Sequence, residues 1–445
     1  MTTLAAPSRR LTRRQSLSLA AWAVLGASCN AQTPARGSVP PDAVGAGLSD
    51  PLARRFYQQR GWRAAWDPGS IRELIRGIAD ARRHGLDPAA FAPKRDADPT
   101  PARQDENLTA AALAYAKALS EGFVEPRRIE KIYTVGRNSV DLPTGLQQAL
   151  AQRKLGDWLA SLPPSSAEYE TLSAAYLNAL GRSGLSSPPA SGAPVGTSMA
   201  PPDQARQLAA NLERRRWLAR SPAAHRIDVN TAGAFLNYVE PGAQNLALRT
   251  VVGRDDHPTP SIEAPFHRLI ANPPWIVPED IARREILPKG AAYLRRQEMG
   301  WVGGKLEQRP GPECALGLVK FDLEDPYDIY LHDTSAKQLF QEPERHRSHG
   351  CVRVENALDL ARRIAGEVGK GDAFDEALAS RDTREVGLGE AIPVRMLYHT
   401  AYLDAGGGVI LAPDVYGWDD ALAAALGLGQ AAAARRREPE ILFGP

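Results

Sequence analysis

Apolar residues in the first half of the chain recur with the spacing of amphipathic helices. The clearest segment spans residues 70–84, where four apolar positions share one helical face. They are Ile71, Leu74, Ile75 and Ile78. Ser70 and Glu73 stand in the S-x-x-E relation of a capping box, and Gly85 follows as a residue that ends helices readily. Three further helices are predicted, over 107–121, 144–162 and 166–180. Residues 45–183 are therefore predicted to form a helical scaffold domain.

The pattern changes in the second half of the chain. Residues 184–202 are rich in Pro, Gly, Ser and Ala and are predicted to be a linker, and residues 203–219 a connecting helix. Alternation of apolar and polar residues then begins near residue 220 and indicates short strands. The predicted strands cover 226–230, 234–239, 246–253, 267–272, 317–323, 328–332, 351–354 and 393–402. This second domain, residues 220–420, is therefore predicted to be mostly β.

Two segments of the second domain depart from alternation. Residues 275–312 form a charged, helix-favouring stretch with Pro and Gly, which is typical of an inserted flap or lid. Residues 355–368 have helical spacing, and residues 421–445 are predicted to be a C-terminal tail. The fold class predicted for the whole chain is α+β, with a helical scaffold domain before a mostly β domain that carries an insertion.

Composition narrows the class of protein. A chain of 445 residues is too long for one ordinary core, so several structural units are expected. The hydrophobic fraction of 43% and the charged fraction of 24% are those of a globular protein. A net charge of +2 provides no field that would attract nucleic acid, and no nucleic-acid partner is expected.

The first 31 residues have the features of an export signal. Four arginines precede an apolar stretch over residues 17–27, which is too short to cross a bilayer as a helix. Residues 12–17, TRRQSL, resemble a twin-arginine signal, and a plain positively charged n-region is the alternative. The sequence therefore predicts export to the periplasm. Without the signal only Cys314 and Cys351 remain, too few for a disulfide framework.

Cys351 is the residue with the strongest indication of chemistry. It lies in Ser348-His349-Gly350-Cys351-Val352-Arg353, beside an imidazole and a guanidinium that can lower the pKa of a thiol. Gly350 has no Cβ, which allows a substrate carbonyl to approach the backbone N–H groups near Cys351 as in an oxyanion hole. The motif predicts a nucleophilic cysteine.

A candidate base lies at the end of the strand predicted over residues 328–332. His332 follows Tyr330-Leu331 and precedes Asp333, whose backbone or side chain could orient the imidazole. His332, His349 and Cys351 are all metal-ligand types, but the compact ligand spacing of structural zinc is missing, so neither a metal nor a cofactor is expected.

These motifs resemble the signature of the YkuD-type L,D-transpeptidases. The signature residues are His332-Asp333-Thr334 and Ser348 to Arg353, and other stretches resemble the long, YcbB-like branch of that family. Those stretches are Asn211 to Arg214, Trp217-Leu218, Thr250 to Arg254, Asn272 to Pro278, Ile286 to Lys289 and Leu318 to Phe321, with Phe56-Tyr57, Trp66 and His84 to Leu86 in the first half. The branch usually has a small peptidoglycan-binding module before its catalytic domain, where this chain has only the Pro-rich linker.

The resemblance implies a two-step acyl transfer between peptidoglycan stem peptides. Cys351 would attack a donor tetrapeptide stem, and the diaminopimelate amine of an acceptor stem would resolve the thioester into a 3→3 cross-link. His332 would be the general base, oriented by Asp333, while Ser348, His349 and Gly350 would shape the site. Other cell-wall synthases are candidate partners, and cell shape is the process such a protein would serve. Residues 275–312 would be the substrate-capping segment.

Several assignments stay open at this level. Arg353 would hold substrate or local structure, and Tyr330 and Trp275 would line the substrate groove or belong to the core. Cys314 is expected to be a small packing residue of the flap, and a redox partner is the less favoured alternative. An L,D-carboxypeptidase, in which water replaces the acceptor amine, would use the same nucleophile, and a scaffold that binds the wall without activity is a third hypothesis.

Overall fold

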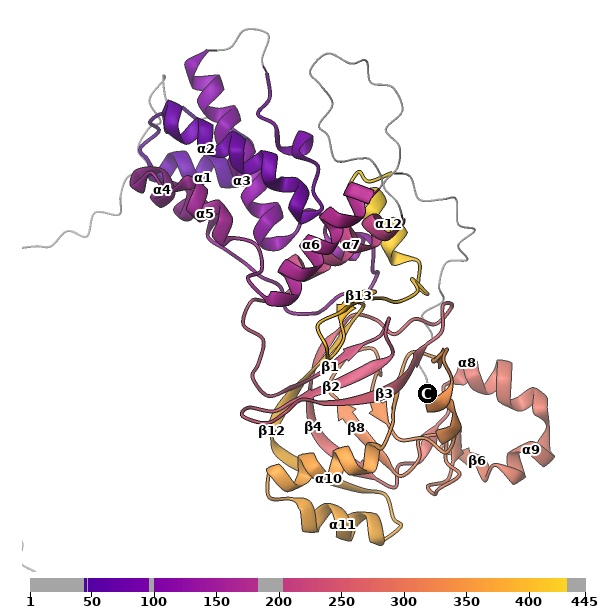
Figure 1. Ribbon diagram of the computed structural model, residues 1–445. Helices are drawn as coiled ribbons and strands as arrows, with labels where there is room; N and C mark the ends of the chain where they lie inside the picture. The colour runs from indigo at the N-terminus through magenta and orange to yellow at the C-terminus, as the bar shows by residue number, and fades with distance from the viewer. Residues whose placement is uncertain (1–43, 46, 96–99, 183–202, 430–445) are drawn as a thin grey trace, which may run out of the picture. The chain divides into compact units, whose positions relative to one another are not determined.

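The computed structural model describes residues 44–45, 47–95, 100–182 and 203–429 (Figure 1). The predicted export signal over 1–31 and the predicted linker over 184–202 lie outside the described residues. None of the helices in the described ranges combines the length and apolar character needed to cross a membrane. The described chain has a helical part, a β-barrel and a small lobe inserted into the barrel (Figure 1).

The first part is helical, as the apolar spacing predicts. Its helices are α1 (Pro51–Gln59), α2 (Pro68–Ala79), α3 (Pro101–Glu121), α4 (Leu142–Gln152), α5 (Leu155–Ser161), α6 (Ala167–Arg182) and α7 (Asp203–Trp217). They enclose one hydrophobic core, in which Phe56, Leu74 and Leu119 are almost completely buried. The single helix predicted over 144–162 is two helices, α4 and α5, because Arg153 adopts a left-handed backbone conformation between them.

The predicted capping box at the start of α2 is wrong. The N-cap is Asp67, whose carboxylate accepts hydrogen bonds from the N–H groups of Gly69 and Ser70 at 2.7 and 3.1 Å. Pro68 at the first helical position starts the helix two residues earlier than predicted. Glu73 instead accepts a hydrogen bond from the N–H of Gly156 in α5, at 3.0 Å. A tertiary contact therefore uses the carboxylate that the local pattern assigned to the cap.

The chain does not become a tail at residue 421. Helix α12 (Trp418–Ala425) crosses the predicted boundary and packs against α7. Leu422 and Ala423 of this helix and its C-cap residue Leu426 are buried, and the two leucines belong to the core of the helical part. The buried apolar face of this short helix makes it part of the folded chain, and residues 430–445 of the predicted tail lie outside the described residues.

The second part is a β-barrel. Its strands are β1 (Arg226–Asn230), β2 (Phe235–Val239), β3 (Leu246–Gly253), β4 (Glu263–Ala271), β8 (Val319–Leu323), β9 (Leu331–His332), β10 (His346–Ser348), β11 (Val352–Val354) and β12 (Arg384–Leu397). The strand order is β10-β3-β11-β9-β8-β4-β12-β1-β2, and a further pairing of β2 with β3 closes the ring. Helices α10 (Ala357–Glu367) and α11 (Gly371–Ala379) lie side by side against the barrel (Figure 1). The last predicted strand, 393–402, is divided between β12 and a separate hairpin, β13 (Ala401–Leu403) with β14 (Val409–Leu411).

The inserted lobe contains more β structure than its composition indicates. Between β4 and β8 the chain forms α8 (Glu279–Ile281), α9 (Ala291–Arg296) and a small sheet of β5 (Trp275–Ile276), β7 (Lys305–Gln308) and β6 (Met299–Val302), in that strand order. The lobe has its own core, which includes Ile281, Leu306 and Cys314. It is therefore a small folded unit rather than a simple loop.

Candidate active site

Strand pairing brings the predicted nucleophile and base together. Strands β9 and β11 are parallel neighbours, with Leu331 opposite Val352 and His332 opposite Arg353. Side chains alternate between the two faces of a sheet, so Cys351 and Arg353 share one face with His332. Leu331 and Val352 point the other way, into the barrel core. One face of this strand pair is therefore apolar, and the other carries the candidate chemistry.

Two further residues complete this polar face. Tyr330 precedes Leu331 and shares the face with His332, and its carbonyl accepts a hydrogen bond from the N–H of Val352 at 3.0 Å. Lys320 of β8 lies opposite His332, with its ammonium 4.3 Å from the centre of the Tyr330 ring. Sequence reasoning did not single out Lys320, although it lies within one of the family-like stretches. The sequence signal that could have identified Lys320 is its place between Val319 and Phe321, two core residues, which puts Lys320 on the opposite face of β8.

The thiol of Cys351 is enclosed. The residue is 0% exposed, and Sγ lies 3.6 Å from the carbonyl oxygen of Asp328. Burial raises the pKa of the thiol to about 12, an effect that Tyr330 and Lys320 only partly oppose. At neutral pH the cysteine is therefore a protonated thiol, which must lose its proton to act as a nucleophile.

His332 is equally buried and is available as a base. Its side chain is 0% exposed, and neither ring nitrogen has a hydrogen-bond partner of normal geometry among the described residues. Burial, followed by the charge of Arg353, lowers the pKa of His332 well below its ordinary value, while the backbone of Asp333 acts in the opposite direction. A neutral imidazole on the same face as a protonated thiol can accept its proton as a general base when the two groups come within hydrogen-bond distance, and it does not form a pre-existing ion pair.

The Asp333 side chain contacts the backbone of a neighbouring turn rather than the imidazole of His332. Its carboxylate accepts a hydrogen bond from the N–H of Leu318 at 3.0 Å and forms an ion pair with Lys337. Gly317 has a φ of 59°, and a Cβ there would lie 2.3 Å from Oδ2 of Asp333. The carboxylate thus fixes the turn before β8, and only the backbone of Asp333 acts on His332.

The loop before Cys351 is held by a chain of short hydrogen bonds. Ser348 Oγ donates to the carbonyl of Cys351 at 2.6 Å and accepts from the N–H of Gly350 at 3.2 Å. Thr259 Oγ1 donates to the carbonyl of Gly350 at 2.7 Å, and Gly350 has a φ of 120°, a conformation that favours glycine. The N–H of Cys351 has no acceptor among the described residues. It is therefore the better candidate for an oxyanion donor.

His349 connects this loop to the inserted lobe. Its Nε2 lies 2.6 Å from Oε1 of Glu285, and Arg254 reaches the same carboxylate at 3.3 Å. Burial lowers the pKa of His349, and the Glu285 carboxylate opposes that effect. His349 therefore faces a carboxylate of the lobe, and no sequence pattern predicted its contact with Glu285 or the approach of Arg254 to the same carboxylate.

The remaining predicted site residues differ in position. Arg353 is half-buried, and its Nε has no partner among the described residues. Tyr330 and Asp328 line a cavity of about 960 Å³ between the barrel and the lobe, together with Lys320 and Arg283. Trp275 is 6% exposed and packs in the core of the lobe instead. No group of three histidine, cysteine or carboxylate side chains suited to a metal occurs within the described ranges.

Comparison with known proteins agrees with this arrangement. Residues 224–386 match the family described as the L,D-transpeptidase catalytic domain, YkuD, and residues 51–175 match the Scaffold domain. The chain is 30% identical over 238 residues to a protein of Haemophilus influenzae named "Putative L,D-transpeptidase". That match covers 48% of each protein, so the chain spans about half the length of this curated relative.

The chain therefore contains a YkuD-type L,D-transpeptidase catalytic domain, preceded by a helical Scaffold domain. This confirms the family predicted from the histidine and cysteine motifs and the α+β fold class predicted from periodicity. The pairing of these two domains is consistent with the long, YcbB-like branch.

The protonation state of Cys351 has a measurable consequence. Alkylation of Cys351 by iodoacetamide should accelerate about tenfold per pH unit from pH 7 to pH 10, because only the thiolate reacts and its pKa is about 12. Intact-mass kinetics in a Cys314→Ala background measure this rate. If the rate stops rising before about pH 8 and stays constant at higher pH, the thiolate is already formed near neutral pH. That result would contradict the general-base arrangement.

Loss of the contact between the lobe and the motif loop should expose the thiol more often. Glu285→Ala removes the carboxylate that both His349 and Arg254 contact, so opening of the lobe should become easier. We expect alkylation of Cys351 to be about tenfold faster, equivalent to roughly 1.4 kcal/mol. Glu279→Ala, which removes an exposed carboxylate of the same lobe, is the matched control. Equal rates in both variants would rule out this role for Glu285.

Proposed function

We propose that this protein is a cysteine-dependent L,D-transpeptidase that forms 3→3 cross-links between diaminopimelate residues of peptidoglycan stems. The observation that carries the proposal is the shared face of β9 and β11, where Cys351, His332, Tyr330 and Arg353 lie together. The match of residues 224–386 to an L,D-transpeptidase catalytic domain supports the reaction class.

The first half-reaction makes a thioester. The ring of His332 takes the proton of Cys351, and Sγ attacks the carbonyl carbon of the third residue of the donor tetrapeptide. The N–H of Cys351 is placed to stabilise the resulting oxyanion. The C–N bond to D-Ala then breaks, and the proton held by His332 goes to the departing amine. The acyl group of the donor stem remains on Cys351.

The second half-reaction transfers that acyl group. The side-chain amine of diaminopimelate on an acceptor stem attacks the thioester carbonyl and loses a proton to His332. The C–S bond breaks, an amide forms, and the proton returns to the sulfur. The cavity beside Tyr330 and Asp328 is the proposed place for the stems, because its lining residues Lys320 and Arg283 can pair with stem carboxylates.

Product analysis distinguishes transfer from hydrolysis. The protein is incubated with disaccharide-tetrapeptide, and the products are identified by mass. Cross-linked dimers with loss of D-Ala support the proposal. Tripeptide alone would show that water resolves the thioester, which is the L,D-carboxypeptidase alternative. If no thioester forms and no carbapenem is attached at Cys351, the enzyme hypothesis is wrong, and binding of the substrate without such an adduct would support the inactive wall-binding scaffold.

The proposed place of action is the periplasm. The proposal is supported by the positively charged and apolar pattern of residues 1–31, which is typical of an export signal. Export by the twin-arginine route is one form of this proposal. Peptidoglycan stems are the proposed partners, and other cell-wall synthases are further candidates. Cell fractionation tests the location, and recovery of the protein with the cytoplasm would contradict it.

A further inference from the structure

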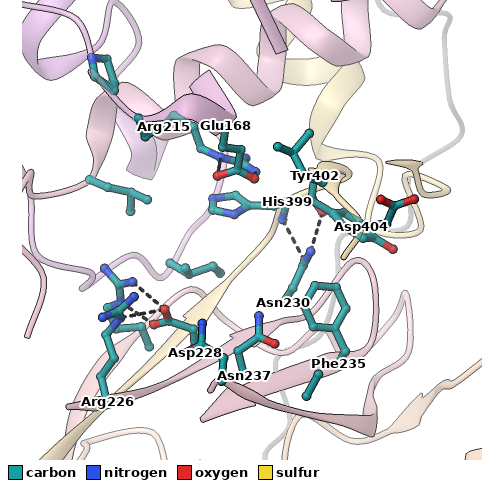
Figure 2. Close-up of a pocket in the computed structure, with 18 of the residues that line it drawn as sticks. Glu168, Arg215, Arg226, Asp228, Asn230, Phe235, Asn237, His399, Tyr402 and Asp404 are labelled. Carbon is teal, nitrogen blue, oxygen red and sulfur yellow. Dashed lines mark hydrogen bonds and ion pairs between the residues drawn. The ribbon is translucent and has the colours of Figure 1, made fainter. Parts of the chain in front are cut away.

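A second cavity of about 810 Å³ lies over β12, β1 and β2, and Figure 2 shows residues that line it. In the ring of strands, β12 and β1 lie opposite β11 and β9, which flank the cysteine. Its floor is a row of planar polar side chains across three strands, with Asp228 opposite both Arg395 and Asn237. Its other walls include Glu168 of α6, Arg215 of α7 and the segment from His399 to Ala405. A cavity of this volume is within the range of small-molecule sites.

Most of the charged groups of this cavity are paired with one another. Arg395 makes a bidentate ion pair with Asp228 at 2.7 and 2.9 Å, and Arg226 binds the same carboxylate at 2.8 Å. Arg215 contacts Glu168 at 2.7 Å and the carbonyl of Ala401 at 2.9 Å. Four arginines and three carboxylates line the cavity in all, so it has little excess charge to attract an anion. Paired in this way, the arginines act as a rigid frame.

Three uncharged polar groups of half-buried residues line the cavity and make no hydrogen bond to any described residue. They are the amide of Asn237, the imidazole of His399 and the hydroxyl of Tyr402. Asn230 holds the backbone of His399 on both sides, accepting from its N–H at 3.2 Å and donating to its carbonyl at 3.0 Å (Figure 2). Burial and the neighbouring arginines 214, 215 and 395 keep the pKa of His399 well below its ordinary value, so the ring is a neutral donor and acceptor.

An aromatic surface adjoins these groups. The rings of Phe235 and Tyr402 lie 5.1 Å apart at an angle of 57°, and both line the cavity. Fixed amide, imidazole and phenol groups beside an aromatic ring suit a neutral ligand with hydroxyl and amide groups and apolar C–H faces. A chain of N-acetylated amino sugars has this chemistry.

We propose that this cavity, which we call the Asn237 pocket, binds a short segment of the glycan chain of peptidoglycan. The inference rests on the proposed function, because that function supplies the glycan to which the stem peptides are attached. Binding there would hold a glycan strand on the barrel while its stems react at the cysteine. Peptidoglycan recognition would then reside in the scaffold and catalytic domains themselves.

Calorimetric titration with a neutral probe tests the proposal. The probe is the tetramer of β-1,4-linked N-acetylglucosamine, added to the full chain, and cellotetraose is the matched sugar without acetamide groups. We expect the tetramer to bind with a Kd of about 1 mM or tighter, and cellotetraose to bind at least about fivefold more weakly. No binding of the tetramer would overturn the proposal.

Variants assign that binding to the pocket. Asn237→Leu and Tyr402→Phe should each weaken tetramer binding about five- to tenfold, because each removes hydrogen-bonding groups while nearly keeping the shape. Gln104→Leu on α3, the same kind of change on an exposed residue, should not change it. Unchanged binding in both pocket variants would place the sugar elsewhere and overturn the proposal.

Two controls separate this inference from others. Tenfold more salt should hardly change binding of the neutral tetramer, and a steep loss of affinity would indicate an ionic mode and contradict it. Carbapenem acylation of Cys351 should persist in the pocket variants, which also shows that they are folded, and Cys351→Ala should still bind the tetramer. Sugar binding without acylation would therefore refute only the proposed function. Acylation without sugar binding would refute only the inference that the Asn237 pocket binds glycan.

Discussion

Replacement of Cys351 by alanine should abolish acyl transfer while the protein stays folded. The thiol is the proposed nucleophile, and loss of a nucleophile in a covalent mechanism lowers the rate by roughly 10⁴-fold or more. Alanine fits the site because Cys351 is fully buried and a small residue replaces a small one. Formation of dimer from disaccharide-tetrapeptide, followed by mass, measures the effect.

Cys314→Ala is the matched control for this experiment. Cys314 is also buried and its pKa is also raised by burial, but it lies in the core of the inserted lobe. Its replacement should leave the turnover within about threefold of the wild type. If Cys351→Ala keeps more than about one hundredth of the activity, while its unfolding is unchanged, another group is the nucleophile and the mechanism proposed above is wrong.

Replacement of Glu213 by alanine should destabilise the helical part by about 3–5 kcal/mol. Glu213 and Arg216 of α7 are both 0% exposed, and Arg216 Nε donates to Glu213 at 3.2 Å. The same carboxylate accepts from the N–H of Val124 at 2.7 Å and from Nε1 of Trp217 at 3.1 Å. Without it, a buried guanidinium loses its counter-charge and two further donors lose their acceptor.

Urea unfolding followed by tryptophan fluorescence measures this loss. The matched control is Asp375→Ala, which breaks the ion pair with Arg362 on the surface, where the two side chains are 57% and 46% exposed. Such pairs contribute about 0–1 kcal/mol. A loss of less than about 1 kcal/mol for Glu213→Ala would mean that water or another residue replaces the carboxylate.

These results also explain part of the family resemblance. The stretch from Asn211 to Leu218 resembles the long branch, yet it contributes no residue to the face that carries Cys351. Asn211 donates to Thr400 Oγ1 at 2.6 Å, and Arg214 pairs with Asp419 of α12. Its polar residues therefore fasten α7 to the segment after the barrel. A motif can match a family because of packing as well as chemistry.

The sequence by itself determined the features that depend on short-range periodicity. Alternation predicted β1 to β3 within a residue or so, because residues i and i+2 of a strand share a face whatever the strand packs against. The motif around Cys351 and His332 also indicated the family, since the residue types needed for nucleophilic catalysis lie within short stretches. The same periodicity separated the helical half of the chain from the β half.

Only the tertiary structure decided which distant residues meet. The parallel pairing of β9 with β11 puts His332 on the same face as Cys351, and contact with the lobe puts Glu285 against His349, 64 residues away in sequence. Burial of the site then raises the pKa of Cys351, although its sequence neighbours indicated a lowered value. The physical reason is that desolvation and long-range pairing depend on everything that surrounds a group, whereas a sequence window contains only its covalent neighbours.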